Sequence, residues 1–497
     1  MAEVRSLTGA RTSLGGAPRG TGTVSTGFLV AGVAAVTLFV FWLATEALSD
    51  WQTVWVALVG ITIFALLAMA LSVSPSGVLQ HRNLVFALWA ILLGSEEVFS
   101  YMSDPDSAMS GHFTGGAYSE AMIWVFVFIG LLAYFVRNPR YLNGIFSGSY
   151  KWGALFGLAC LASCTYTEDR IFALAWCFKL LLTIGLLWAC NREIKTYDDL
   201  RVFLISTFLG FAFLIFPPVV RLMSELEVLK TGRLYDVAAA PTMLSADAGC
   251  LVVLACALYR PTFRALPVAF ALLGSVMMLI SAGKTGIVAC IISGVLFFFV
   301  QGKVSGALRF VVGIALIAGL LLAVTPLGAY LSSYLGSAQA FSVTGRTDVW
   351  VKGLELIKQH PILGRGFMAS RFLSYNIDVY WQPGHMHNGF LEALYNNGAI
   401  GFFFLLMMHI TIVRNLLTAI RSYTGIAGFK QIAAGCLALY TDILINGMVS
   451  RAFGSRPDAT FMALFALVMV SYRLRGMAGE SQAVRLADRQ FRSAVAY

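Results

Sequence analysis

The sequence has little charge for its length. Only 12% of its 497 residues are Asp, Glu, Lys or Arg, whereas 58% are hydrophobic. Soluble domains carry about 25% charged and about 45–50% apolar residues, so this chain has too little polar surface for a water-soluble particle of its size. The composition argues against a soluble multidomain enzyme, a disordered chain and a fibrous protein.

Strands of alternating polarity are also missing. Apolar runs such as Ile291–Val300 do not alternate, as the strands of a membrane barrel would. The chain instead has runs that could cross a hydrocarbon layer of about 30 Å as helices, which takes about 17–25 residues. They predict an all-α integral membrane protein with about 14 transmembrane helices. The runs are 27–46, 53–73, 83–101, 119–136, 152–166, 171–190, 202–220, 246–259, 265–282, 285–301, 310–327, 398–413, 431–448 and 459–472.

We expect no removable signal peptide either, because no small-residue cleavage site follows the first apolar run. We expect residues 1–26 to be a disordered cytoplasmic tail, residues 27–472 a single membrane domain and residues 473–497 a second cytoplasmic tail. The eight cysteines fall in or at the ends of apolar segments, so we expect packed side chains rather than disulfides. The sequence shows no internal repeat of the kind found in many transporters.

Lys and Arg indicate the side of the membrane on which each short loop lies. With the N-terminal tail inside, the inside segments hold 22 of the 35 basic and six of the 25 acidic residues, a net charge of +16. The remaining 13 basic and 19 acidic residues give −6. This division predicts that both termini are cytoplasmic. It attributes the net charge of +10 to membrane insertion and not to nucleic-acid binding.

One long connection, expected over residues 328–397, lies on the outer side in this orientation. Trp350, Leu354 and Ile357 are spaced to share one face of a helix, with polar residues on the other faces and Pro361 at its end. The pattern predicts an amphipathic helix that lies at the membrane surface.

Cations and histidines gather in this outer loop. Because long loops are exempt from the orientation rule, its basic residues do not contradict the topology, and they indicate that an anion is bound there. The basic residues are Arg346, Lys352, Lys358, Arg365 and Arg371, and the histidines are His360, His385 and His387.

Two stretches of the loop carry motifs. The first is TGRTDVW at 344–350, followed by HPILGRGF at 360–367. The second is HN-x9-G-x-x-G, from His387 to Gly401. With the helix layout, these motifs resemble the bacterial O-antigen ligase and polymerase family, whose second motif is H-[NSQ]-x9-G-x-x-[GTY]. The resemblance covers the whole chain in architecture and roughly 284–401 in motifs.

The resemblance implies a GT-C-like membrane glycosyltransferase in the bacterial inner membrane. Such an enzyme transfers a glycan from undecaprenyl diphosphate to an acceptor hydroxyl, with no cofactor or metal. The leading expectation is polymerisation of lipid-linked repeat units into a surface polysaccharide or exopolysaccharide, which the helix count slightly favours. The alternatives are an O-antigen ligase acting on lipid A-core and, from a different class, a lipid-linked glycan transporter or flippase. Partners expected besides the lipid-linked glycan and the bilayer are a flippase and a chain-length regulator.

The resemblance also assigns roles to individual residues. His387, Arg346 and Lys284 fall at the family's catalytic positions, where the family has an Arg in place of Lys284. A lysine keeps the charge but loses the planar two-pronged contact of a guanidinium with phosphate. The residues expected to bind substrate are Arg233, Arg365, Asn388 and His385. The two motif glycines, Gly398 and Gly401, are expected to allow close backbone packing.

These residue types suit the implied reaction. Diphosphate is a good leaving group, so the step needs no general acid, unlike glycoside hydrolysis with its two carboxylates. Cations stabilise the departing phosphates. The acceptor hydroxyl is a poor nucleophile, and a histidine with a pKa of about 6.5 is a suitable base. One His and two cations are therefore a sufficient set.

Two rival interpretations stay open. Asp104 and Asp106 form a D-x-D with His112 nearby, as in glycosyltransferases that hold a divalent metal in an outer loop. Ionisable residues in or beside apolar segments also mark ion pathways in transporters. Here these residues are Glu96, Glu97, Lys179 and Asp442.

Overall fold

The regular elements of the described chain are helices, as the sequence predicts. Each predicted apolar segment from 83–101 onward lies on a helix, and the helices that contain 398–413 and 459–472 are much longer than predicted, whereas 27–46 and 53–73 lie outside the described part. The computed structural model describes residues 81–100, 115–216, 218–219, 241–261, 264–324, 346–373, 385–422, 425–449 and 453–495.

Thirteen α-helices and three short 3-10 helices make up this part of the chain. The α-helices are α3 (His81–Ser100), α5 (Gly115–Arg137), α6 (Lys151–Ser163), α7 (Arg170–Glu193), α8 (Tyr197–Leu214), α10 (Pro241–Leu258), α11 (Ala265–Ile280), α12 (Lys284–Val300), α13 (Val304–Val324), α15 (Arg346–Gln359), α17 (Gly389–Arg421), α18 (Phe429–Val449) and α19 (Ala459–Val495). The 3-10 helices are η2 (Pro139–Leu142), η3 (Gly148–Tyr150) and η5 (Ala369–Phe372).

Five helices in the described part are long and apolar enough to cross a membrane: α7, α13, α17, α18 and the Ala459–Ser481 part of α19. Further apolar helices, shorter than these, lie in α5, α6, α10, α11 and α12. The molecule is therefore a multi-pass membrane protein. Helices suit this role because they satisfy their own backbone hydrogen bonds within the lipid.

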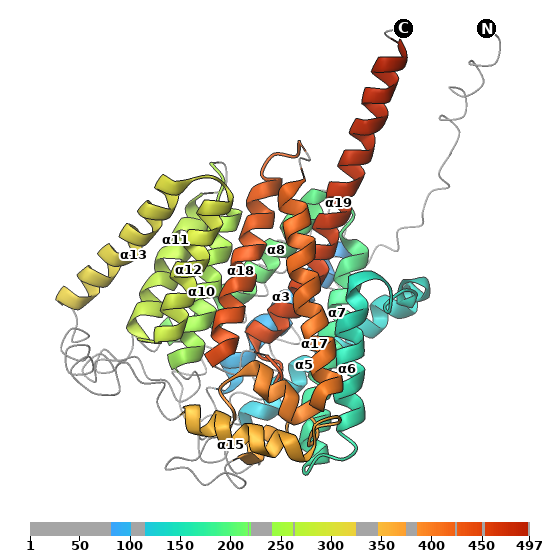
Figure 1. Cartoon of the computed structure of the whole chain (residues 1–497), viewed down its shortest axis with the longest axis vertical. Helices are drawn as coiled ribbons and strands as arrows, with labels where there is room; N and C mark the ends of the chain where they lie inside the picture. The colour runs from blue at the N-terminus through green and yellow to red at the C-terminus, as the bar shows by residue number, and fades with distance from the viewer. Residues whose placement is uncertain are drawn as a thin grey trace, which may run out of the picture.

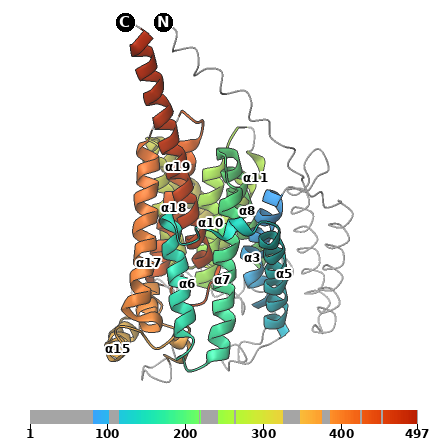
Figure 2. The same cartoon turned by 90° about the vertical axis from the view of Figure 1, so that its right-hand side faces the viewer.

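The long helices run side by side in one bundle, and α15 lies across one end of it (Figure 1). We call this the motif end, because it carries the two motifs. At the opposite end α19 extends beyond the other helices, and the two views agree on this (Figures 1 and 2). The segment predicted as a C-terminal tail after 472 thus continues the last span as one helix to Val495.

Capping residues set where several helices begin. The carboxylate of Asp169 accepts a hydrogen bond from the backbone N–H of Phe172 and so starts α7. Thr196 and Asp199 form a reciprocal capping box at the start of α8. Arg82 of α3 donates to the Asp199 carboxylate over 2.5 Å and ties the two helices together at the opposite end.

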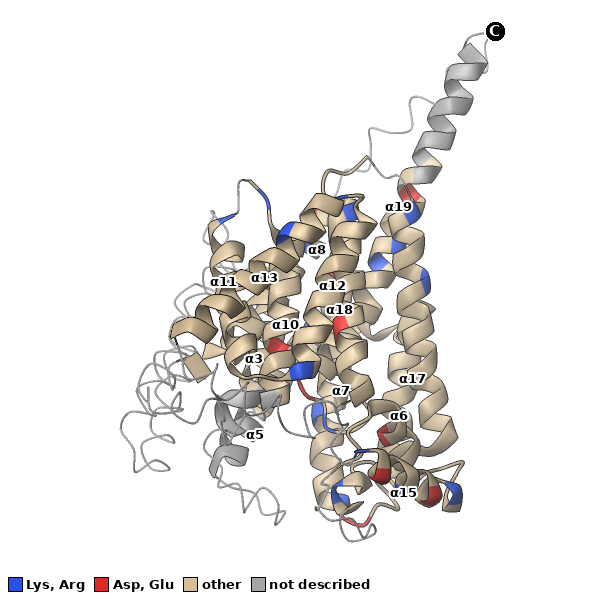
Figure 3. Ribbon diagram, turned by 60° about the vertical axis from the view of Figure 1, so that its left-hand side comes forward, with Lys and Arg blue, Asp and Glu red and all other residues tan. Residues whose placement is uncertain are grey.

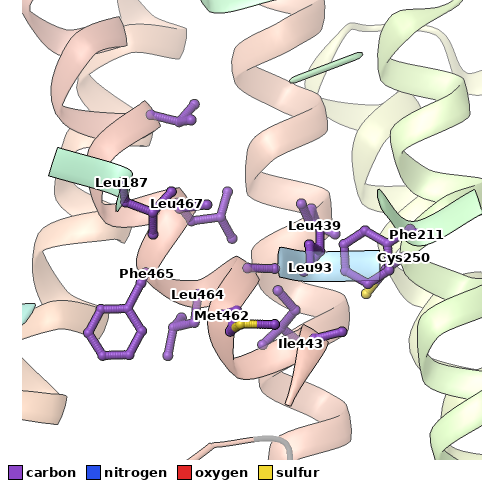
Figure 4. Close-up of a cluster of buried hydrophobic side chains, with 14 of the residues drawn as sticks. Leu93, Leu187, Phe211, Cys250, Leu439, Ile443, Met462, Leu464, Phe465 and Leu467 are labelled. Atoms are coloured by element: carbon purple, nitrogen blue, oxygen red, sulfur yellow. The ribbon is translucent and has the colours of Figure 1, made fainter. Parts of the chain in front are cut away.

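The core is a continuous cluster of apolar side chains between the helices. Figure 4 shows a part of it in which Leu93 of α3, Phe211 of α8, Cys250 of α10, Leu439 of α18 and Leu464 of α19 lie together, each fully or almost fully buried. Such contacts hold membrane helices together through dispersion and close packing. All eight cysteines are free and all but Cys256 are buried, which confirms the expectation of packed thiols.

Lys179 and Asp442, two of the residues that suggested an ion pathway, are buried within the bundle. The ammonium of Lys179 lies 5.4 Å and 5.2 Å from the ring centroids of Trp124 and Trp176. Asp442 accepts hydrogen bonds from the Cys250 thiol and the Asn446 amide. These contacts show how the fold accommodates two of the residues that suggested an ion pathway. The side chains of the other two, Glu96 and Glu97, lie outside the described part.

Candidate active site

The second motif lies on a broken helix. α17 contains one residue with non-helical backbone angles, Gly398, at φ 59° and ψ −165°. These angles are accessible essentially only to glycine. The break divides α17 into a short first half, from Gly389 to Asn397, and a long apolar second half that starts at Ala399, one residue after the predicted start of the span at 398.

The segment Pro361–Gly366 is hydrogen-bonded to the backbone groups of α17 on both sides of this break. The backbone N–H of Ala399 donates to the carbonyl of Pro361 over 2.9 Å, and the N–H of Gly366 donates to the carbonyl of Asn396 over 2.8 Å. A Cβ atom on Gly398 would lie 2.2 Å from the Ile362 carbonyl oxygen. The glycine-rich stretch of the first motif therefore packs directly against the first glycine of the second motif, and we call this contact the joint between the motifs. The prediction that Gly398 allows close backbone packing is confirmed.

His387 lies in the loop that enters α17. It has a φ of 52°, a left-handed conformation that is uncommon for residues other than glycine. Its backbone N–H donates to Nδ1 of His385 over 3.1 Å, and the centroids of the two rings are 3.8 Å apart. The structure thus places the proposed base and its predicted neighbour side by side, both partly exposed.

Glu392 holds this loop in place from the first turn of α17. One carboxylate oxygen accepts the backbone N–H of Met386 over 2.9 Å, and the other accepts the Ser370 hydroxyl over 2.6 Å. Glu392 and Met386 are both buried. The residue before His387 is therefore fixed by a charge-assisted hydrogen bond, which is about twice as strong as a neutral one.

Asn388 caps α17. Its side-chain oxygen accepts the backbone N–H groups of Phe390 and Leu391, at 3.0 Å and 3.1 Å. Its amide donates to the carbonyl of Met448, near the end of α18. The expectation that Asn388 caps the following helix is confirmed, and its role in substrate binding stays a prediction.

The predicted amphipathic helix is α15. It contains part of the first motif and packs against the loop of the second. Trp350 Nε1 donates to the carbonyl of Met386 over 2.8 Å. The buried face of α15 differs by about one residue from the predicted one: Val349 and Gly353 are buried, whereas Leu354 is 43% exposed. The reason is that Gly353 lets the Met386 side chain approach, with a Cβ on Gly353 lying only 2.9 Å from the Met386 methyl carbon.

Arg365 lies at the joint between the motifs. Its guanidinium donates to the Gln359 side chain over 2.6 Å and lies 5.8 Å from the centroid of the Tyr395 ring. Burial raises the pKa of Tyr395, although the positive charge of Arg365 acts in the other direction. Arg365 thus has a structural role in joining α15 to the first half of α17, beside its predicted role in binding phosphate.

Lys284 starts α12 at the motif end. The Ser245 hydroxyl, near the start of α10, donates to the carbonyl of Gly283 over 2.9 Å and fixes the turn before Lys284. At the other end of α10, Tyr259 accepts a hydrogen bond from Gln431 at the start of α18. Because α18 ends beside Asn388, α10 and α12 both begin at the motif end.

Arg346 is also at the motif end, since it is the first residue of α15 and is partly exposed. Lys284 is exposed. The structure therefore brings the helices of Arg346, Lys284 and His387 to one end of the bundle. Arg233 lies outside the described residues, as do Asp104, Asp106 and His112 of the D-x-D alternative.

Residues with strained backbone angles lie at the motif end. Within the described ranges, the non-glycine residues with positive φ are Ala282, Met368 and His387. Ala282 lies two residues before Lys284, Met368 lies three residues after Arg365, and His387 is the motif histidine. Such conformations cost about 1–3 kcal/mol each and cluster at functional sites, where the surrounding structure enforces them.

Sequence reasoning missed the residues that support the motifs. Glu392, Ser370 and Asn396 are buried polar residues linked by hydrogen bonds, including one from the backbone N–H of Ser370 to the Asn396 side chain over 2.9 Å. The sequence did contain one indication of them, since a carboxylate and two amides lie in the first turns of a largely apolar helix. Across the described part of the chain, no three His, Cys, Asp or Glu side chains gather where they could hold one metal ion.

The fold defines a multi-pass membrane protein whose two loop motifs are hydrogen-bonded to each other at one end of the bundle. In a comparison with known protein families, residues 269–406 match the model described as O-antigen ligase. This range includes Lys284, Arg346 and His387. The predicted resemblance to the O-antigen ligase and polymerase family is confirmed.

A curated protein is similar to this chain over a short stretch. The exopolysaccharide production protein ExoQ of Rhizobium meliloti (strain 1021) is 32% identical over 79 residues. The similar stretch covers 14% of this chain and 18% of that protein.

Proposed function

We propose that the protein is a glycosyltransferase that polymerises undecaprenyl-diphosphate-linked repeat units into a surface polysaccharide or exopolysaccharide, on the periplasmic side of the inner membrane. The observation that best supports this proposal is the hydrogen bond from Trp350 to the Met386 carbonyl. It joins the helix of Arg346 to the loop of His387, which supports a shared site for the proposed cation and the proposed base.

In the proposed step, the acceptor hydroxyl oxygen bonds to the anomeric carbon of the donor glycan. The bond between that carbon and the diphosphate oxygen breaks, and the diphosphate leaves with the electron pair. His387 takes the proton from the acceptor hydroxyl. Arg346 and Lys284 stabilise the negative charge that develops on the diphosphate.

The fixed backbone around His387 supports its role as the base. Glu392 holds the residue before it, and Asn388 caps the helix after it. Holding a catalytic group in position before the reaction lowers the entropic cost of reaching the transition state. The left-handed φ of His387 is a conformation of the kind that clusters at functional sites, which also supports this role.

The second candidate is an O-antigen ligase that transfers finished glycan to lipid A-core. The description of the matching family model favours it. The name of the similar relative, an exopolysaccharide production protein, favours polymerisation. Both reactions use the same donor and the same proposed roles for His387, Arg346 and Lys284, and they differ in the acceptor.

A deletion strain distinguishes these functions. For a polymerase we expect the deletion to abolish polymer and leave acceptors capped with single repeat units. A ligase predicts free polymer that never reaches the core. Repeat units stranded on the inner face of the membrane would contradict both and support the transporter. Complementation with wild-type protein and with His387→Ala then assigns the phenotype to this residue.

Metal independence is part of the proposal. We expect transfer by purified protein to be unchanged after EDTA treatment. Loss of transfer with EDTA, restored by a divalent cation, would overturn this part and favour the D-x-D alternative.

A further inference from the structure

A cavity of about 280 Å³ lies at the end of the bundle opposite the motifs. Its walls come from α10, α11 and α12 and are apolar, with Val268, Ala271 and Phe297 among them. Its polar lining includes Gln301 and Lys303, in the connection between α12 and α13. The site therefore combines an apolar interior with a positive charge.

The cavity faces the outside of the bundle. Val268 is 44% exposed, and its neighbour one turn along α11, Leu272, is 53% exposed. In a multi-pass membrane protein, apolar side chains exposed on the outer face of spanning helices contact lipid. A lipid chain can therefore reach the cavity from the side, without passing through the protein.

The charged residues on α11, α12, α13 and the connections beside them are all basic at this end. Arg264, Lys303 and Arg309 are all exposed in this region, and Figure 3 shows Lys and Arg at this end near α11 and α13. The sequence has no Asp or Glu between Asp247 and Asp348. An anion near these cations therefore meets no repulsion from acidic residues on the helices α11, α12 and α13.

Lys303 is the cation best placed to bind such an anion. Its ammonium donates to the Gln301 side chain over 3.1 Å, which uses one of its three N–H donors. Arg260 is directed elsewhere, since it donates to the Tyr197 hydroxyl and the Ala427 carbonyl.

We propose that this cavity binds an anionic phospholipid, with part of one acyl chain along the apolar wall and the headgroup phosphate on Lys303. Basic pockets between membrane helices are recurrent sites for anionic headgroups. The volume is just below the lower limit of about 300 Å³ for small-molecule pockets, which suits a segment of one chain. By the distribution of Lys and Arg, the lipid belongs to the cytoplasmic leaflet.

Native mass spectrometry of the full-length protein in detergent tests the proposal. The protein is titrated with phosphatidylglycerol and, separately, with phosphatidylethanolamine of the same acyl chains. We expect Lys303→Ala to weaken phosphatidylglycerol binding about fivefold, which is roughly what one lysine near an anionic membrane surface contributes. Lys195→Ala is the matched control, because Lys195 is an exposed lysine at the same end that does not line the cavity.

A second variant tests the apolar wall. Ala271→Leu fills part of the cavity and should weaken binding without changing the charge. Equal phosphatidylglycerol affinity in the Lys303 and Lys195 variants would overturn the proposal, and so would equal affinity of the wild type for the two lipids. A co-purified polyprenyl phosphate that phosphatidylglycerol cannot displace would overturn it as well. Melting curves without added lipid check that Lys303→Ala is folded, so this variant decides the outcome if Ala271→Leu fails to fold.

Discussion

At the residue scale, two positions with unusual backbone angles carry the site. Gly398 breaks α17, and His387 turns the chain into it. The motif spacing of nine residues between Asn388 and Gly398 is the length of the first half of α17, from its cap to its break. The motif therefore describes a short helix that is bounded by a capping amide and by a glycine whose backbone angles other residues rarely adopt.

Substitution of this glycine should be severe. Gly398→Ala places a Cβ 2.2 Å from the Ile362 carbonyl oxygen, at backbone angles that alanine rarely adopts. We expect a loss of at least about 2 kcal/mol of stability, from the backbone strain alone. Thermal melting in detergent measures it. Gly313→Ala is the control, because a Cβ there meets no atom within 4 Å, and an equal loss in both variants would contradict this account of Gly398.

Glu392 should act as a positioning residue. Glu392→Gln replaces one carboxylate oxygen with an amide that cannot accept a hydrogen bond from the Met386 N–H or the Ser370 hydroxyl. We expect about 2 kcal/mol of lost stability and a lower kcat with little change in KM, because His387 loses its fixed position. Glu355→Gln on the exposed side of α15 is the control. An unchanged kcat in the Glu392 variant would contradict the positioning role.

The sequence was enough to find His387, Asn388 and Arg346 as candidates, because they stand in recognisable motifs. It was not enough to find Glu392. The partners of Glu392 are the backbone of Met386 and the hydroxyl of Ser370, 6 and 22 residues away in the sequence, and no local pattern shows that they meet.

At the element scale, α15 shows what periodicity can and cannot predict. Its existence and its end near Pro361 follow from apolar spacing and a helix-breaking residue, and both are confirmed. Its buried face was wrong by about one residue, since Leu354 is exposed and Val349 is buried. The apolar residues of α15 are compatible with two overlapping buried faces. The Trp350 hydrogen bond and the close approach of Met386 to Gly353 determine which face is buried.

The capping box at the start of α8 gives an element-scale prediction with a pH dependence. Burial tends to raise the pKa of Asp199, but hydrogen bonds from Thr196, Arg82 and Lys195 together hold it below its ordinary value of 3.8. Because the pKa is lower in the folded state, the carboxylate stabilises the fold above about pH 4, and this contribution is lost as the pH falls through the folded pKa.

Asp199→Asn should therefore lower the stability at pH 7 by about 2 kcal/mol. The difference from wild type should shrink as the pH is lowered below about 4, when the wild-type carboxylate also becomes neutral. Melting temperatures over a pH series measure this. Asp198→Asn is the control, because the Asp198 side chain is 84% exposed. A difference that stays constant with pH would contradict the role of the charge.

At the scale of the whole molecule, residues predicted to lie on opposite sides of the membrane must lie at opposite ends of the helix bundle. The distribution of Lys and Arg predicts that the motif end is periplasmic and the opposite end cytoplasmic. The fold separates the two groups of residues, with α15 and the motif loop at one end and Lys303 and Arg264 at the other (Figures 1 and 3). The sidedness itself is a prediction that follows from sequence and not from the helix packing.

Cysteine labelling tests this sidedness. Val351→Cys is exposed on α15, and Ser305→Cys is exposed at the start of α13. In spheroplasts, a membrane-impermeant maleimide should label the first and not the second, and after lysis it should label both. The native thiols give little background, because all but Cys256 are buried. Labelling of Ser305→Cys alone in spheroplasts would contradict the predicted orientation.

The most direct test of the central claim is the rate of glycan transfer by purified protein from an undecaprenyl-diphosphate-linked donor. If His387 is the base, His387→Gln should lower kcat by about 10²–10⁴-fold, the usual contribution of general base catalysis. His360→Gln, an exposed histidine at the end of α15, should keep the wild-type rate. A wild-type rate in His387→Gln, with donor consumed and polymer formed, would contradict the account.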